Sequence, residues 1–232
     1  METVLITGSN RGIGLEWARQ YAKKGWRVHA TCRYPEQASE LRLLAEAQSM
    51  VSIHKLDVTR QEDVRLLARA MSGSPIDVLI NNAGVYFEHW GRDRLGHINY
   101  DDWAATFEVN TLGPMRVSEA LIDSIALSEH RLIVAITSNM GSISEILAPN
   151  DYAYRSSKAA LNAAMKGLAL EVAERGVGVL LLHPGWVRTR MGGEDTALTP
   201  EESVRGMCRL VEQFSPLQSG HFYRYDGSAM PW

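Results

Sequence analysis

Short apolar segments alternate with segments of helical periodicity along this 232-residue chain. A continuous apolar run of about four to eight residues, rich in Val, Ile and Leu, is typical of a strand buried on both faces, as in a parallel sheet. Because strands that alternate with helices are joined by right-handed crossovers, the pattern predicts an α/β fold with a doubly wound, mostly parallel sheet. The runs that we assign to strands are Thr3–Gly8, Arg27–Cys32, Ser52–Val58, Ile76–Ile80, Arg131–Thr137 and Val177–Leu182.

Three segments carry signals for the ends of helices. An apolar stripe that begins at Ile13 and is followed by Gly25 predicts a helix that ends at this glycine. Thr59–Glu62 has the pattern of a capping box and predicts the start of a second helix. Thr199–Glu202 repeats that pattern with Pro200 at the first helical position, which predicts the start of another.

Composition excludes several classes of protein. Hydrophobic residues make up 45% of the chain and charged residues 22%, which is the balance of a globular protein. The formal net charge of −3 gives no reason to expect binding to nucleic acid or to a membrane surface. No apolar run approaches the ~18 residues of a membrane span, and the first residues lack the features of a secretory signal. Cys32, Cys208 and the histidines show no metal-ligand spacing, so we expect a reduced, cytoplasmic protein without a metal site.

In a doubly wound sheet, ligands bind beyond the carboxyl ends of the strands. The first strand is followed by Thr7–Gly14, which has the spacing G-x3-G-x-G and leads into a helix. Glycines in such a loop allow the backbone to approach a pyrophosphate at the helix N-terminus. An ordinary glycine-rich turn is the alternative interpretation.

The residue after the second strand indicates which dinucleotide is bound. A site for a free adenine-ribose hydroxyl usually has a carboxylate there, whereas this chain has Arg33, about twenty residues after the glycines. A guanidinium suits a 2′-phosphate, and Arg11 adds a second positive charge. We therefore expect NADP rather than NAD, unless both arginines are merely solvated surface residues.

The third and fourth strands end in weaker signals. Asp57 follows the third strand, where its carboxylate could accept a hydrogen bond from adenine or could simply cap the loop. Asn81–Gly84 follows the fourth strand, and its small residues allow the backbone to pass close to a ribose.

Tyr154 and Lys158 form the strongest local signal, because residues four apart share one face of a helix. An ammonium beside a phenol favours the phenolate, and a shift of the tyrosine pKa from ~10 to ~7 requires about 4 kcal/mol. Lys158 together with the positive ring of an oxidised nicotinamide could supply much of this. Tyr152 has Ser156 four residues on, which offers no charge. A surface Tyr/Lys pair on a helix is the alternative.

Three further positions are candidates for chemistry or cofactor contact. Ser138 ends the fifth strand, where a hydroxyl could donate to a substrate carbonyl. Asn110 lies in an otherwise apolar helical stretch, either to hold a buried water or as a satisfied polar residue at a helix kink. Pro184 and Gly185 end the sixth strand, where their backbone could face a nicotinamide amide.

Together these motifs, in this order and over nearly the whole chain, resemble the short-chain dehydrogenase/reductase family. The gap of sixteen residues between Ser138 and Tyr154 is longer than in many members. This gap, the segment Leu5–Glu16 and the closing Tyr225-Asp226-Gly227 are similar to the branch that contains the Sniffer carbonyl reductases and C-factor.

The resemblance implies a seven-stranded Rossmann fold in one domain over residues 1–232, and hydride transfer between NADPH and an aldehyde, ketone or quinone. On this basis Tyr154 would be the general acid, Lys158 would lower its pKa and bind the nicotinamide ribose, Ser138 would polarise the carbonyl and Asn110 would anchor a water. The expected cofactor contacts are Gly8, Asn10, Arg11, Gly12, Ile13, Gly14, Arg33, Asp57, Val58, Asn82, Ala83, Gly84, Tyr154, Lys158, Pro184, Gly185, Val187 and Thr189.

Substrate and assembly are less constrained. Residues 85–103 and 186–198 are expected to roof the site and favour an apolar or aromatic substrate, a carbonyl compound or an alcohol. The side chains behind this expectation, which could equally be core or interface residues, are Tyr86, Phe87, Trp90, Trp186 and Met191. The family resemblance suggests a homodimer or homotetramer. A signalling protein like C-factor that retains the cofactor site, and an isomerase or dehydratase on the same scaffold, remain alternative functions.

Overall fold

The computed structural model describes residues 1–88 and 94–232. In these residues seven strands form one sheet in the order β3-β2-β1-β4-β5-β6-β7, and every neighbouring pair is parallel. The doubly wound α/β fold predicted from the sequence is therefore confirmed, with a wholly parallel sheet. The strands are β1 (Thr3–Ile6), β2 (Arg27–Cys32), β3 (Val51–Lys55), β4 (Val78–Asn81), β5 (Leu132–Ile136), β6 (Gly178–His183) and β7 (His221–Arg224).

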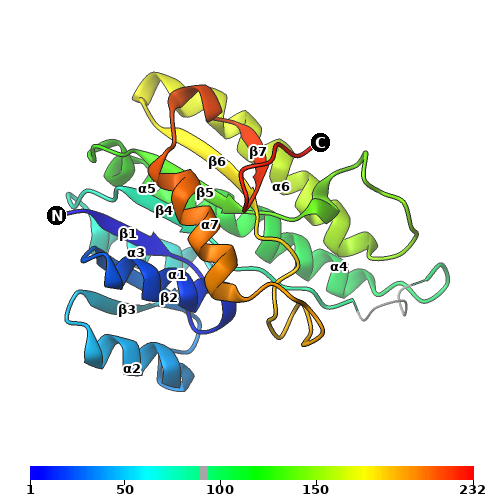
Figure 1. Ribbon diagram of the computed structural model, residues 1–232, viewed down its shortest axis with the longest axis horizontal. Helices are drawn as coiled ribbons and strands as arrows, with labels where there is room; N and C mark the ends of the chain where they lie inside the picture. Colours follow the sequence, from blue (N-terminus) through cyan, green and yellow to red (C-terminus); the bar gives the residue numbers. More distant parts are fainter. Residues whose placement is uncertain (89–93) are drawn as a thin grey trace.

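Helices cover both faces of the sheet (Figure 1). Alternate strand residues point to opposite faces, so Val4 and Ile6 of β1 pack with one set of helices and Leu5 with the other. The first set is α1 (Gly12–Lys23), α2 (Ser39–Ala47) and α7 (Pro200–Glu212), and the second is α3 (Gln61–Met71), α5 (Gly113–Ala126) and α6 (Tyr152–Glu171). The short α4 (Tyr100–Phe107) packs against α6 and continues through a π-helical turn, Glu108–Leu112, into α5.

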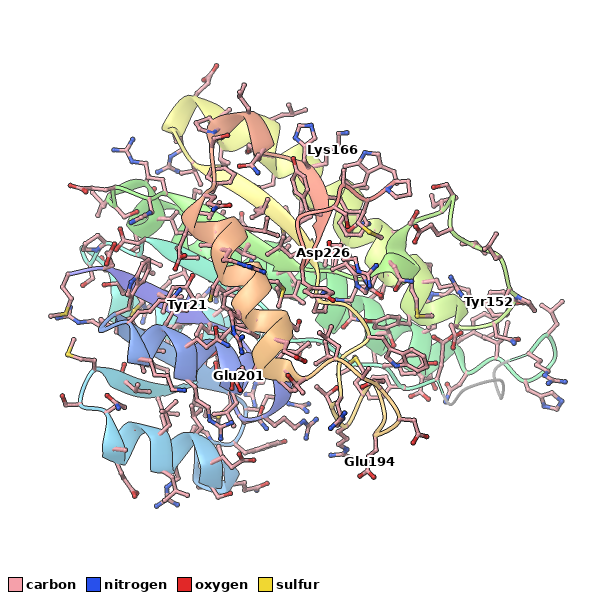
Figure 2. All side chains as sticks on the ribbon, in the orientation of Figure 1. Tyr21, Tyr152, Lys166, Glu194, Glu201 and Asp226 are labelled. Carbon is pink, nitrogen blue, oxygen red and sulfur yellow. The ribbon has the colours of Figure 1, made fainter. Side chains whose placement is uncertain are left out.

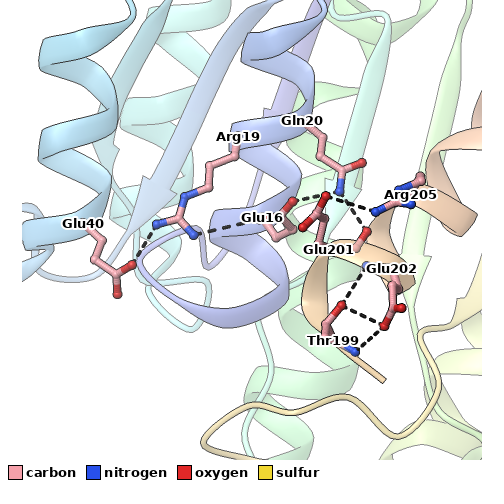
Figure 3. Close-up of polar contacts among 8 residues, drawn as sticks. All are labelled: Glu16, Arg19, Gln20, Glu40, Thr199, Glu201, Glu202 and Arg205. Atoms are coloured by element: carbon pink, nitrogen blue, oxygen red, sulfur yellow. Dashed lines mark hydrogen bonds and ion pairs between the residues drawn. The ribbon is translucent and has the colours of Figure 1, made fainter. Parts of the chain in front are cut away.

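The predicted helix signals have different outcomes. Gly25 follows α1 with a φ of +78°, a conformation that favours glycine. The Thr199 side chain and the Glu202 carboxylate make both bonds of the predicted capping box, while the Gln20 amide of α1 donates to the Glu201 carbonyl at 3.0 Å (Figure 3). These contacts fasten the start of α7 to α1.

The capping box predicted at Thr59–Glu62 is wrong. The helix begins at Gln61 after Arg60, and the Thr59 hydroxyl instead donates to the Asp57 carboxylate at 2.7 Å. The Asp63 carboxylate reaches back to accept the Asp57 N–H at 3.0 Å. The bonds from the Thr59 hydroxyl and N–H to the Asp57 carboxylate turn Thr59 toward the loop after β3, away from the N–H groups at the start of the helix.

The predicted strand ends extended too far at the first and third strands. β1 ends at Ile6, so Thr7 and Gly8 belong to the loop, and β3 ends at Lys55, before Asp57. None of the helices in the described ranges is long and apolar enough to cross a membrane.

Two helical glycines provide a test of this packing. A Cβ at Gly206 of α7 would lie 2.4 Å from the carbonyl oxygen of Tyr225, whereas one at Gly167 of α6 would meet nothing within 4 Å. We expect Gly206→Ala to destabilise the fold by about 1–3 kcal/mol or more, because backbone must move. Gly167→Ala should be neutral or stabilising by up to about 1 kcal/mol. Urea denaturation of both variants measures the difference, and equal stability would contradict the close packing of α7.

Candidate active site

The carboxyl ends of β1, β2, β4, β5 and β6 lie along one edge of the sheet because all of these strands are parallel. The connections on the two sides of the β1/β4 pair run in opposite directions, which makes this pair the topological switch point. The loops that carry the predicted site residues meet at this edge.

Tyr154 and Lys158 lie one turn apart on α6, and the Lys158 Nζ is 5.7 Å from the centroid of the Tyr154 ring. Tyr152 belongs to a different face of the helix, where its ring stacks against Trp103 with centroids 6.3 Å apart. Figure 2 shows Tyr152 at the first turn of α6. The structure therefore separates the two tyrosines as predicted.

Removal from water changes the pKa of both members of the pair. It raises the pKa of Tyr154 to about 12, an effect that a hydrogen bond with Ser138 opposes. It lowers the pKa of Lys158 to about 8. Without cofactor the net effect on Tyr154 is a raised pKa, because the desolvation of the phenol is the largest cause. That Lys158 and the positive ring of an oxidised nicotinamide lower this pKa stays a prediction. Tyr154 keeps its proton at neutral pH.

Lys158 is 4% exposed, and its Nζ donates to the carbonyl oxygen of Ile136 at 2.9 Å. An ammonium has three donors, so two remain for other partners. A Cβ built at Gly84 would lie 3.8 Å from the same Nζ, which places the backbone of the Asn82–Gly84 segment directly beside the amine.

Asn110 lies within the π-helical turn and is fully buried. Its Oδ1 accepts the Val85 N–H at 2.8 Å, and its Nδ2 donates to the Val85 carbonyl at 2.9 Å and to the Ser157 hydroxyl at 3.1 Å. Both amide donors are used, and one lone pair of Oδ1 is left for another donor such as a water. The two interpretations offered by the sequence, a helix irregularity and a water anchor, are thus compatible.

Ser138 lies two residues after the end of β5 and is 7% exposed. Its Oγ accepts the Met140 N–H at 3.1 Å and donates to the Asn139 Oδ1 at 3.3 Å. It also forms the hydrogen bond with Tyr154, so the fold brings these two hydroxyls together from elements sixteen residues apart.

The glycine loop after β1 leaves the N-terminus of α1 accessible. Gly8 and Gly12 have φ values of +69° and +54°, and a Cβ at Gly14 would lie 2.1 Å from the Gly8 carbonyl oxygen. Within the described residues, no side chain caps this helix and its first turn holds no acidic residue. Because unpaired N–H groups and the helix dipole attract anions, this loop with Asn10 and Ile13 suits a phosphate group.

The Asn82–Gly84 segment supports the glycine loop. Asn82 Nδ2 donates to the carbonyl oxygens of Thr7 and Gly8 at 2.9 and 3.1 Å, and the Thr7 hydroxyl accepts the N–H groups of Asn82 and Ala83, each at 3.0 Å. The Asn82 side chain therefore joins the loop after β1 to the segment after β4. Only the backbone of Asn82–Gly84 is left to contact a ligand.

Three exposed arginines gather near the same loop. Burial and the charges of Arg190 and Arg33 lower the pKa of Arg11. None of the three forms an ion pair with another described residue. Uncompensated positive charge of this kind fits a phosphate. Our sequence interpretation found Arg11 and Arg33 but missed Arg190, for which the only signal was its place one residue after Thr189.

At the third strand, Asp57 and Val58 have structural contacts. The Asp57 Oδ1 accepts from the N–H and the hydroxyl of Thr59, which fits the alternative interpretation of a loop cap. Val58 is 6% exposed, and a Cβ at Gly113 would lie 2.7 Å from its Cγ2. Both stand at the site edge, and a role for them in cofactor contact stays a prediction.

The segment after β6 returns to the glycine loop. The Pro184 carbonyl accepts the Ser203 hydroxyl of α7 at 2.6 Å, and Gly185 has a φ of +85°. Val187 pairs with Leu198 at the base of the loop. The Thr189 Cγ2 lies 3.4 Å from the position of a Cβ on Gly12, so this segment contacts the glycine loop directly.

Residues 186–198 project from the sheet beyond β6, and Figure 2 shows Glu194 near the outer tip of this segment. Trp186 is 62% exposed, Met191 41% and Phe87 41%, so these side chains are not part of the core. Trp90 lies outside the described residues.

A cavity of about 450 Å³ lies against the other face of α6, between that helix, Trp103 and Ile143. Its walls are mainly apolar and include Tyr152 and Ser156 but none of the predicted catalytic residues. Met140, whose N–H bonds to the Ser138 hydroxyl, also lines this cavity, so the cavity lies beside the candidate active site.

Comparison with known proteins identifies relatives of the whole fold. The family model for short chain dehydrogenases matches residues 2–198. C-signal of Myxococcus xanthus is 43% identical over 169 residues, which are 73% of this chain and 100% of that protein. The NADPH-bound carbonyl reductase from chicken fatty liver has a TM-score of 0.92 at 31% identity, covering 100% of this chain and 99% of that one. The carbonyl reductase Sniffer of D. melanogaster gives 0.92 at 30% identity with both chains fully covered. These relatives confirm the predicted branch.

The buried Lys158 yields a prediction about stability. Its pKa is about 8 in the folded protein and 10.5 when unperturbed. Burial of the charged ammonium therefore lowers the free energy of unfolding, because in the unfolded chain the same group is hydrated. This penalty, about 3 kcal/mol, is complete below pH 8 and disappears as the pH rises to 10.5. We expect Lys158→Met to stabilise the protein at pH 7 by about 1–3 kcal/mol, because the loss of the hydrogen bond to Ile136 offsets part of the gain. Near pH 10 this stabilisation should disappear.

Thermal denaturation at pH 7 and pH 10 measures this effect. The exposed Lys23 of α1 provides the control, because Lys23→Met removes the same charge without relieving burial. An equal change in Tm for both variants at both pH values would contradict the cost assigned to Lys158.

Proposed function

Since the chain belongs to the short-chain dehydrogenase family and is an oxidoreductase of that family, we propose that it is an NADPH-dependent carbonyl reductase. The reaction would transfer a hydride between NADPH and an aldehyde, ketone or quinone. The observation that carries this proposal is the placement of Tyr154, Ser138 and Lys158 at one sheet edge, beside an uncapped helix N-terminus and three arginines.

The residues at this edge fit the cofactor. The glycine loop and the first turn of α1 would hold its pyrophosphate, since the N–H groups there have no capping side chain among the described residues. Arg11, Arg33 and Arg190 would hold the 2′-phosphate, and Lys158 would bind the nicotinamide ribose. NADPH supplies the hydride when bound. The NADPH-bound structure of the chicken carbonyl reductase supports this choice over NADH.

The chain's own side chains would handle the proton and the carbonyl. Ser138 would donate a hydrogen bond to the carbonyl oxygen and orient it. Tyr154, which keeps its proton because its pKa is about 12, would protonate that oxygen as negative charge develops on it. This pKa favours the role of acid, in the direction of reduction. Asn110 would hold a water with the free lone pair of Oδ1, next to Lys158.

Substrate class follows from the loops around the site. We propose one domain over 1–232 in which residues 85–103 and 186–198 cover the substrate. The exposed Phe87, Trp186 and Met191 favour an apolar or aromatic carbonyl compound. Location in the cytoplasm and assembly into a homodimer or homotetramer stay predictions.

A signalling role is a second candidate, and the 43% identity to C-signal favours it. The two functions are separated by measuring oxidation of NADPH with a panel of aldehydes, ketones and quinones. Turnover supports the reductase. Tight NADPH binding without turnover of any member of the panel supports the regulatory function.

The role of Tyr154 predicts the effect of one hydroxyl. We expect Tyr154→Phe to reduce kcat to less than a few per cent of wild type, because the ring keeps its packing but has no proton to donate. NADPH binding, followed by cofactor fluorescence, should be retained. Tyr152→Phe removes the same group from the neighbouring face of α6 and should leave kcat near the wild-type value. Substantial activity in Tyr154→Phe would exclude Tyr154 as the acid.

Cofactor preference provides another test. A charge-assisted contact to a phosphate contributes roughly 1.5–3 kcal/mol, and less where the groups stay solvated. Because Arg11 and Arg33 are exposed, we expect their two contacts together to favour NADPH over NADH by only about tenfold to several-hundredfold in kcat/KM. We expect Arg33→Asp to lower kcat/KM for NADPH steeply and to leave that for NADH equal or higher. Arg42→Asp, on the exposed side of α2, controls for the change of charge. Equal losses with both cofactors would mean that Arg33 supports the fold instead.

A further inference from the structure

The N-terminus of α6 is capped by a side chain from a distant part of the chain. A helix leaves its first four N–H groups without partners in the helix. Asp151, the residue before α6, makes no side-chain capping bond within the described residues. Instead the Glu88 carboxylate accepts the Ala153 N–H at 2.8 Å with Oε1 and the Tyr154 N–H at 2.7 Å with Oε2. This carboxylate is 7% exposed, so the contacts are shielded from water.

Tyr86 makes a second link to the same helix end. Its hydroxyl donates to the Asp151 Oδ1 at 2.5 Å, and its ring meets the Tyr154 ring edge-on with centroids 5.0 Å apart. Burial and the nearby Asp151 raise the pKa of Tyr86, so this hydroxyl remains a donor. Asp151 has a φ of +56°, which a residue other than glycine rarely adopts, and the bond from Tyr86 holds the side chain at this turn.

The segment of residues 85–88, which carries Tyr86 and Glu88, is also fixed at its first residue, Val85. Val85 exchanges two hydrogen bonds with Asn110, and Asn110 donates to the Ser157 hydroxyl. Ser157 in turn donates to the Tyr154 carbonyl at 2.8 Å. Residues 85–88 therefore connect the π-helical turn to the first turn of α6 by contacts at both ends.

We propose that Glu88 and Tyr86 are positioning residues for Tyr154. The inference rests on the proposed function of Tyr154 as the general acid. Glu88 holds the backbone of the residue that bears the phenol. The bond from Tyr86 to Asp151 fixes the Tyr86 ring where its edge-on contact limits the rotation of that phenol. Since a displacement of about 1 Å at a reacting group lowers a rate by as much as about a hundredfold, the two contacts act on kcat. The groups that would hold the pyrophosphate and the 2′-phosphate lie on other elements, and Lys158 lies one turn further along α6, so cofactor affinity depends on these two contacts much less than kcat does.

Two conservative variants test the proposal. Glu88→Gln keeps one acceptor oxygen, but its NH2 group cannot accept the second N–H. Tyr86→Phe keeps the ring and removes the bond to Asp151. We expect each variant to lower kcat by about tenfold or more while the Kd for NADPH stays within about twofold of wild type. We also expect faster amide hydrogen exchange in residues 153–157 than in wild type.

Asp77→Asn is a matched control. Asp77 is also 7% exposed and also accepts a backbone N–H, that of Thr3 at 2.8 Å, at the opposite edge of the sheet. We expect it to lower Tm without lowering kcat. The proposal is overturned if Glu88→Gln and Tyr86→Phe keep wild-type kcat, or if Asp77→Asn loses as much kcat for the same loss of Tm.

Failure of the proposed function has a different signature. Wild-type protein that reduces no carbonyl compound would refute the role of Tyr154 as the acid, whatever the variants do. Hydrogen exchange then still decides whether the two side chains hold the first turn of α6, since unchanged protection of residues 153–157 in both variants would refute the link itself.

Discussion

Every strand of the sheet is parallel to its neighbours, so the chain leaves each strand at the same edge and returns through a helix. Loops that are far apart in the sequence therefore lie next to one another along the carboxyl ends of the strands. At the centre of this edge, where the connections change direction, the Asn82 amide donates to the carbonyl oxygens of Thr7 and Gly8. These bonds hold the glycine loop against the next strand, and the position of α1 and of its uncapped N-terminus follows from them.

The site is assembled from groups that are costly to bury. Lys158 and Tyr154 both have pKa values shifted toward their neutral forms, and Asn110 and Glu88 need specific backbone partners to be satisfied. Two apolar clusters, one on each face of the sheet, provide the stability that compensates for them. If the proposed activity is correct, the arrangement favours activity at the expense of stability.

Sequence patterns predicted the elements well where the cause is local. Apolar runs identified six of the strands, Thr199–Glu202 identified the start of α7, and the four-residue spacing distinguished Tyr154 from Tyr152. They were wrong where a neighbour in space competes. Thr59 bonds to Asp57 rather than to its helix. The raised pKa of Tyr154, which comes mainly from burial of the phenol, was not foreseen either. Burial and competing acceptors depend on which segments pack together, and a local pattern does not contain that information.

The sequence by itself determined the class of fold, the position of the glycine loop and the pairing of Tyr154 with Lys158 on one helix. It also placed Arg11 and Arg33 next to the ends of the first two strands. Periodicity and spacing along one segment are sufficient to specify each of these features. Only the tertiary structure decided that Glu88 caps the helix of Tyr154, that Asn110 is fastened to Val85, and that Arg190 joins the other two arginines. These contacts join residues from separate loops, and the relative position of two loops is set by the packing of the strands and helices between them.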